Sequence, residues 1–197
     1  MDVPSLIFLA NIMKVKYSEK IDREIFKEVT FMGKKLSPIF GFQFPKVKFD
    51  KKITPIAKAM VKVLPAFMYE KRIITMMKKM YGKDMPEITI YINTTPFSTW
   101  NVEAGWVSVS MERGHSKFFQ TVCHEINHFM YDYTFKTRKY EDTEIKEILT
   151  VLNNIFGIED KGWKIFSEKR KAALDFYEKT KDFKKTIEYV KTFYKLK

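Results

Sequence analysis

The spacing of apolar residues along the chain predicts an α+β protein whose strands lie in the middle of the sequence. Two short segments, 87–93 (EITIYIN) and 106–111 (WVSVSM), alternate between apolar and other residues. Both are rich in residues that favour strands, and the segment between them, 94–105, has the composition of a loop. We therefore expect a small central sheet with helices before and after it.

Helices are predicted where apolar residues recur every three or four positions, and proline and glycine mark where they end. The expected helical segments are 18–36, 54–81 with a break at Pro65, 116–133, 142–157 ending at Gly157, and two within 160–197 that separate near 180–182. A length of 197 residues with 45% hydrophobic residues fits one globular domain. Its parts are a mainly helical region 1–86, a central region 87–157 and a helical C-terminal region 158–197.

Nothing in the sequence predicts a transmembrane segment or a secretory signal. The longest early apolar run, residues 3–13, has about half the length that a membrane-spanning helix needs. An aspartate precedes it instead of the basic residues of a signal peptide. The single cysteine, Cys123, excludes an internal disulfide bond, so we expect a reducing, cytoplasmic environment.

The candidate chemistry lies in the segment HEINH, residues 124–128. On a helix, one face carries five apolar residues in an arc of roughly 80°: Phe118, Val122, Ile126, Phe129 and Tyr133. His124 and His128 lie about 140° from the centre of that arc and about one turn apart, so both imidazoles can point at one metal ion. Histidine pairs of this spacing suit tetrahedral zinc, one ion per chain, and Glu125 beside them can take a proton from a zinc-bound water.

A catalytic zinc usually has three protein ligands, and the third must be sought elsewhere. No histidine follows His128, and His115, nine residues before His124, is interpreted as a turn or cap residue. The third ligand is therefore expected to be acidic. Glu147 on the next predicted helix is the first choice, and Glu144, one turn earlier, is the alternative.

With these residues, the sequence resembles zincin metallopeptidases of the gluzincin group, whose pattern HExxH-x18-E is matched by HEINH, 18 residues and Glu147. The resemblance covers about residues 87–157 and implies a zincin-like metallopeptidase domain. It implies His124, His128 and Glu147 as zinc ligands and Glu125 as general base and acid. It also implies that an edge strand before the motif helix binds the peptide substrate. The segment around 106–111 has that place, with the substrate-binding residues Trp106, Val107, Ser108 and Val109.

The sequence departs from the gluzincin pattern at several positions. Lys146 stands where an asparagine often precedes the third ligand, and Val151 replaces the acidic residue that orients a ligating histidine. Another residue must orient the imidazoles. The residues available for this role are Asn127, Asp132 and Asn154. The stabiliser of the reaction's oxyanion can only be a tyrosine, and the nearest ones are Tyr131, Tyr133 and Tyr140. The loop that specifies aminopeptidases is missing, so an endopeptidase is the first hypothesis.

Charge supplies the alternative hypothesis. The net charge is +12, but residues 87–160 carry −5, whereas 1–86 carry +10 and 161–197 carry +7. Basic flanks of this kind suit nucleic acid or an anionic surface, although lysine-rich helix faces in solvent have the same composition. The alternative is a nucleic-acid-associated or regulatory protein with a zincin-like fold. The C-terminal 40 or so residues either complete the cleft or cover it as an inhibitor.

Overall fold

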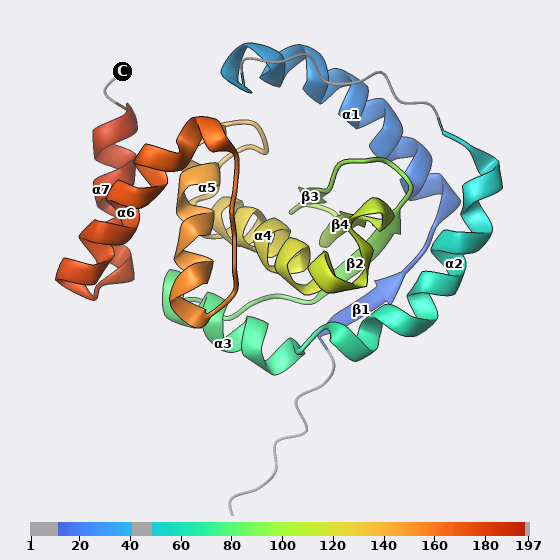
Figure 1. Cartoon of the computed structure of the whole chain (residues 1–197), viewed down its shortest axis with the longest axis horizontal. Coiled ribbons are helices and arrows are strands. Elements are labelled where there is room, and N and C mark those ends of the chain that lie inside the picture. Colours follow the sequence, from blue (N-terminus) through green and yellow to red (C-terminus); the bar gives the residue numbers. More distant parts are fainter. Residues whose placement is uncertain (1–11, 41–48, 196–197) are drawn as a thin grey trace, which may run out of the picture.

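The computed structural model describes residues 12–40 and 49–195, and it has a small mixed sheet enclosed by helices (Figure 1). The strands are β1 (Met13–Lys16), β2 (Ile88–Asn93), β3 (Thr99–Asn101) and β4 (Trp106–Ser110). Their order in the sheet is β1-β2-β4-β3, with β1, β2 and β4 parallel and β3 antiparallel to β4. The α+β prediction is confirmed.

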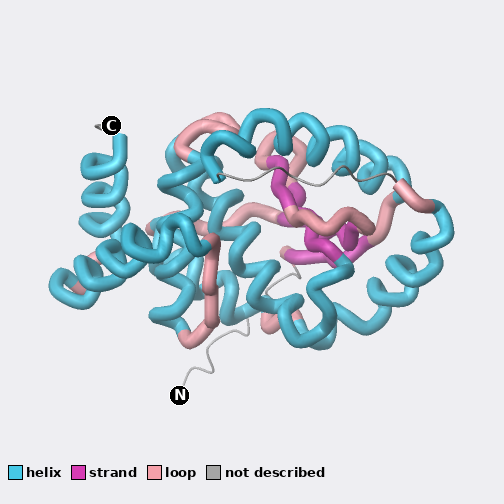
Figure 2. The backbone as a smooth tube through the Cα atoms, turned by 45° about the horizontal axis from the view of Figure 1, so that its top comes forward, coloured by secondary structure: helices cyan, strands magenta, loops and turns pink. Residues whose placement is uncertain are grey.

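Helices surround this sheet, and the central one carries the HEINH segment. The α-helices are α1 (Glu19–Phe40), α2 (Thr54–Val63), α3 (Glu70–Tyr81), α4 (Gly114–Phe135), α5 (Thr143–Leu149), α6 (Ser167–Thr180) and α7 (Phe183–Lys195). Short 3₁₀ helices are η1 (Lys51–Ile53), η2 (Leu64–Phe67), η3 (Met111–Arg113), η4 (Thr150–Phe156) and η5 (Lys164–Phe166). Helix α4 packs against β3 and β4 on one side and α5 on the other. The strands gather at one end of the molecule, and α6 and α7 lie at the other (Figure 2).

The predicted helix ends and breaks at proline and glycine are confirmed. The break at Pro65 falls in η2 between α2 and α3. Gly82 and Gly157 adopt positive φ angles of 66° and 69°, which a glycine tolerates without strain, and each ends a helix there. The two C-terminal helices are separated at residues 181–182, as expected.

The apolar face of α4 packs on the sheet and thereby sets which side chains face away. Phe118, Val122, Ile126 and Phe129 are buried in the same cluster as the inward side chains of β2 and β4. This cluster also contains Ile187 of α7, so the C-terminal helices share one core with the sheet. Since α4 is fixed by this face, both histidines face Glu147 of α5, and His128 also packs against Trp100 of β3.

One prediction about the sheet is wrong: the segment 106–111 is not an edge strand. Strand β4 pairs with β2 on one side and with β3 on the other, so its backbone has no free edge for a peptide. The proposed substrate-binding residues Trp106, Val107, Ser108 and Val109 are all buried. The edge belongs to β3, which lies inside the segment 94–105 that was predicted to be a loop. Strand β1 at the opposite edge was not predicted either.

Among residues 12–40 and 49–195, no helix combines the length and the apolar composition that crossing a membrane requires. Most of the apolar run 3–13 lies outside the described residues.

Candidate metal centre

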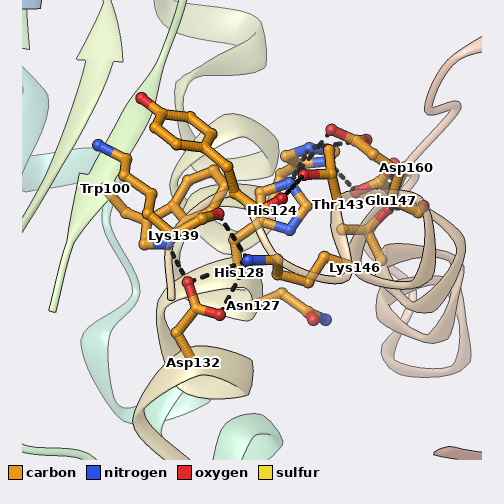
Figure 3. A network of polar contacts seen from close by, with 12 residues as sticks. Trp100, His124, Asn127, His128, Asp132, Lys139, Thr143, Lys146, Glu147 and Asp160 are labelled. Carbon is orange, nitrogen blue, oxygen red and sulfur yellow. Dashed lines mark hydrogen bonds and ion pairs between the residues drawn. The ribbon is translucent and has the colours of Figure 1, made fainter. Parts of the chain in front are cut away.

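Two histidines and one glutamate converge at the contact between α4 and α5 (Figure 3). The Nε2 atoms of His124 and His128 are 3.0 Å apart. The carboxylate of Glu147 faces both: Oε2 is 3.5 Å from Nε2 of His124, and Oε1 is 3.4 Å from Nε2 of His128. We call these three residues the metal cluster.

The metal cluster has the dimensions of a tetrahedral zinc site. Ligand atoms about 2.0–2.1 Å from a tetrahedral ion lie roughly 3.3–3.4 Å from one another. The Nε2 atoms are 3.0 Å apart, and each has one oxygen of Glu147 at 3.4 or 3.5 Å, a different oxygen for each imidazole, so the separations bracket that value. Within the described part of the chain, the buried Oε2 atom of Glu147 has no hydrogen-bond partner. A cation between the three side chains would satisfy it, so the residues present fit a divalent metal ion.

His124 is oriented by Asp160, which the sequence did not reveal as part of the site. The Nδ1 atom of His124 lies 2.8 Å from Oδ2 of Asp160. Because a carboxylate only accepts hydrogen bonds, Nδ1 carries a proton, and in neutral His124 the lone pair is therefore on Nε2, the nitrogen that faces the metal cluster. Asp160 therefore does what the acidic residue four positions after the third ligand was expected to do.

Burial and charge shift the pKa values of these groups in the protein without metal. Burial lowers the pKa of His124, but the carboxylates of Asp160, Glu147 and Glu125 outweigh it and raise that pKa to about 10. Burial and the charge of His124 lower the pKa of His128. Burial alone would raise the pKa of Asp160, yet His124 and Arg170 bring it down to about 2. The site therefore favours charged carboxylates, which a cation requires.

His128 is fixed by an aromatic ring instead of a carboxylate. The ring of Trp100 on β3 lies 4.6 Å from the imidazole, and its Nε1 atom donates to Oδ2 of Asp132 at 2.7 Å. Asp132 in turn forms a buried ion pair with Lys146 at 2.8 Å (Figure 3). Lys146, which departs from the gluzincin pattern, thus points away from the metal cluster and ties α5 to α4.

A cavity of about 380 Å³ opens beside the metal cluster. Its walls come from β3 and the turn before it, from α4, from α5 and Tyr140 before it, and from the segment 159–163. His124, Glu125 and Glu147 all face this space, and Glu125 is 6% exposed. The C-terminal region contributes Glu159 to Trp163 to one wall. In this structure that region completes the cavity.

Only one of the three candidate tyrosines lines the cavity. Tyr140 does, and its hydroxyl donates to the carboxylate of Glu28 on α1. Tyr131 is fully buried and donates to Asp142 at 2.8 Å. Tyr133 stacks on Phe129.

The remaining candidates also have definite places. Glu144, the alternative third ligand, pairs with Lys169 and does not belong to the metal cluster. Asn127 bonds Tyr81 and Asn153, so it does not orient a histidine. Asn154 does not contact a histidine but holds Asp160, because its side-chain oxygen accepts from the backbone N–H of Asp160 at 2.7 Å. The side chain of His115 lies outside those that the structure describes.

The residues that sequence reasoning missed are Asp160 and Arg170, whose side chains form a buried ion pair at 2.9 Å. One signal was present: only five of the 36 basic residues are arginine. In so lysine-rich a chain, a helical arginine is a candidate for a role that needs a planar group with several donors, although Arg23 on α1 is exposed and pairs with Glu19. The position of Asp160 has no local signal, since its partners are 10 and 36 residues away along the chain.

Comparison with known proteins finds no match. The chain matches no protein-family model, no curated protein and no solved structure.

Proposed function

We propose that this protein is a zinc-dependent peptidase with a zincin-like site, and that it cleaves within peptide chains. The observation that carries the proposal is the metal cluster, where two imidazole Nε2 atoms and the carboxylate of Glu147 lie 3.0–3.5 Å from one another, beside a cavity that His124, Glu147 and Glu125 line. Two histidines and a glutamate are a ligand set of catalytic zinc sites, which keep one position open.

Each residue has a separate task in this proposal. His124, His128 and Glu147 hold the ion, and Asp160 keeps His124 turned toward it. Zinc, when bound, supplies a Lewis acid that polarises the scissile carbonyl and lowers the pKa of water. Glu125 takes a proton from the attacking water and gives it to the amide nitrogen as the peptide bond breaks.

The edge strand β3 replaces β4 as the proposed binding strand for the substrate. It is the last strand of the sheet, and Phe97, Ser98 and Trp100 from this stretch line the cavity. An extended peptide can add to such an edge through its backbone hydrogen bonds. Tyr140 is the proposed hydrogen-bond donor to the oxyanion because it faces the same cavity. Its hydroxyl, which donates to Glu28 in this structure, would donate to the substrate oxygen instead.

The alternative, a nucleic-acid-binding protein, is supported by the basic charge of the flanks. The C-terminal tyrosines do not add support for it. Tyr177 and Tyr189, which interleave with C-terminal lysines, are half-buried and pack against the core. Tyr189 also stacks on Phe176 with ring centroids 4.3 Å apart. Rings used in this way are not available as platforms for bases.

Metal analysis tests the proposed function directly. Purified wild-type protein should contain about one zinc ion per chain, and a Glu147→Gln variant should contain much less. Wild-type peptidase activity on an unfolded protein substrate should disappear with a chelator and return with added zinc. A folded wild-type protein that takes up no zinc would refute the proposal, as would a zinc-loaded protein that cleaves no peptide bond.

A further inference from the structure

One guanidinium group behind the metal cluster contacts two of the residues on which its geometry depends. Arg170 on α6 is 3% exposed. Its Nη2 atom donates to the carbonyl oxygen of Asp160 at 2.7 Å and to Oδ1 of the same residue at 2.9 Å. Its Nη1 atom donates to the backbone carbonyl of Glu147 and to the hydroxyl of Thr150. Arg170 thus holds both the residue that orients His124 and the backbone of the third ligand.

The arrangement requires an arginine. The guanidinium is planar and carries five N–H donors in a fixed fork, so it can serve acceptors on two sides at once. A lysine ammonium at the same place keeps the positive charge but is a compact group on a flexible stem. It cannot bridge Asp160 and the carbonyl of Glu147 with the same set of bonds.

The segment 158–163 closes tightly around this guanidinium. Gly162 has a φ angle of 53°, and a Cβ atom added to it would lie 2.5 Å from Cζ and from Nη1 of Arg170. No real Cβ makes so short a contact, so a larger residue would displace the guanidinium. Asp160 is further held by Asn153, whose Nδ2 atom lies 3.3 Å from Oδ2 of Asp160. The second oxygen of Asp160 therefore stays on His124 while the first stays on Arg170.

We propose that Arg170 and Asp160 are positioning residues of the metal centre, so that zinc affinity depends on the packing of α6 against α5. This inference rests on the proposed function only in taking zinc as the ion. Loss of the guanidinium would leave Asp160 free to turn away from His124 and the α5 backbone free to shift Glu147. The C-terminal region is then an integral part of the metal centre, because α6 supplies a residue on which two ligands rely.

Zinc affinity of the full chain, measured in competition with a chromogenic chelator, tests the inference. Asp160→Asn should weaken zinc binding roughly 10- to 100-fold, the usual loss when a partner of a ligating histidine is removed. Arg170→Met should weaken it at least as much, and Arg170→Lys less, because the charge is kept. The double variant should lose less than the product of the two single losses, since both changes act through one bond network. The visible spectrum of the cobalt-loaded protein should shift in the same variants, which a general loss of stability would not cause.

Two controls separate positioning from folding. Lys171→Met, one residue further along α6 and exposed, should bind zinc like the wild type. Gly162→Ala should weaken binding, whereas Gly82→Ala should not: both glycines have positive φ, but a Cβ at Gly82 would meet no atom within 4 Å. If Arg170→Met does not fold, the zinc affinities of Arg170→Lys and Gly162→Ala are compared with those of the two controls to test the positioning role.

The outcomes distinguish the two proposals. Wild-type affinity and an unchanged cobalt spectrum in folded Arg170→Met, or in both Arg170→Lys and Gly162→Ala, would overturn the positioning role and leave the zinc site intact. A wild-type chain without measurable zinc affinity would refute the proposed function, and the positioning role with it. Weakened zinc binding in the variants of a protein that cleaves no peptide would support the positioning role and refute the peptidase.

Discussion

Two clusters of buried charge lie on either side of Trp100, which packs on His128 and donates to Asp132. The clusters differ in how completely their polar atoms are hydrogen-bonded. In the first, which we call the anchor pair, Lys146 donates to both oxygens of Asp132 and to the carbonyl of Lys139. Asp132 also accepts from Trp100 and Thr137. In the metal cluster, the buried Oε2 atom of Glu147 has no hydrogen bond from any described residue, and the cluster borders a cavity.

This difference indicates which cluster serves structure and which serves a ligand. Buried charges are costly unless partners satisfy them, and in the anchor pair the protein itself provides every partner. In the metal cluster the protein leaves Oε2 of Glu147 without a hydrogen bond from a described residue, beside two Nε2 atoms that lie 3.0 Å apart. The anchor pair therefore fixes α5 against α4, and this fixed contact holds Glu147 of α5 opposite His124 and His128 of α4.

The largest expected effect concerns Glu125, which belongs to neither cluster but faces the same cavity. In a Glu125→Gln variant, the kcat for peptide hydrolysis should fall about 10²- to 10⁴-fold, because the proton carrier is lost. Zinc content should stay at the wild-type value, since Glu125 is not a ligand. Steady-state kinetics with metal analysis of the same sample measure both. Glu103→Gln, an exposed change between β3 and β4, is the control. Full activity in Glu125→Gln would remove its assigned role.

The next effect tests whether the anchor pair is structural. Lys146→Met leaves the carboxylate of Asp132 buried without its cation, which should reduce the free energy of unfolding by about 3–5 kcal/mol. Urea unfolding of the metal-free protein measures this loss. The double variant Lys146→Met, Asp132→Leu should recover much of it, because no unpaired charge remains. A change below about 1 kcal/mol in Lys146→Met would mean that this pair behaves like an exposed one and that the comparison fails.

Zinc itself should stabilise the protein, and only through the metal cluster. At a free zinc concentration about 100 times the Kd, the free energy of unfolding should rise by about 2.7 kcal/mol. Thermal unfolding at increasing zinc concentrations follows this shift. The Glu147→Gln variant should show little of it, whereas a variant of the anchor pair that still folds should show a rise. An equal rise in Glu147→Gln would place the zinc at another site.

Local patterns explain which parts of the fold could be predicted. The helices and the strands β2 and β4 follow from apolar spacing and from stop signals such as Gly82 and Gly157, which act over a few residues. Strand β3 has only three residues, too few to display an alternation. The gluzincin resemblance implies an edge strand at 106–111, and the short β3 that pairs with it there gives no signal in the sequence. The pairing of β1 with β2 joins residues 75 apart, which local patterns do not encode.

The residues of the site also divide into those that local patterns predict and those that only tertiary packing brings together. His124, Glu125 and His128 lie within one turn and a half of a helix, so their spacing alone predicted that the two imidazoles converge with Glu125 beside them. Glu147 followed from its position on the next helix and from the gluzincin resemblance. Asp160 and Arg170 reach the site from the C-terminal region, and only tertiary packing brings them to it. The sequence therefore predicted the three side chains that converge, but not those that hold them in place.

The smallest expected effect compares two carboxylates on one helix. Glu144→Gln and Glu147→Gln each remove one negative charge from α5, so any general effect of charge on this helix is shared. The side chain of Glu144 is 37% exposed and pairs with Lys169, and such a pair contributes about 0–1 kcal/mol to stability. Glu144→Gln should therefore change the unfolding free energy by less than about 1 kcal/mol and leave the zinc content unchanged. If Glu144→Gln lost its zinc and Glu147→Gln kept it, the ligand assignment would be reversed, because the pair differs only in which carboxylate faces the two imidazoles.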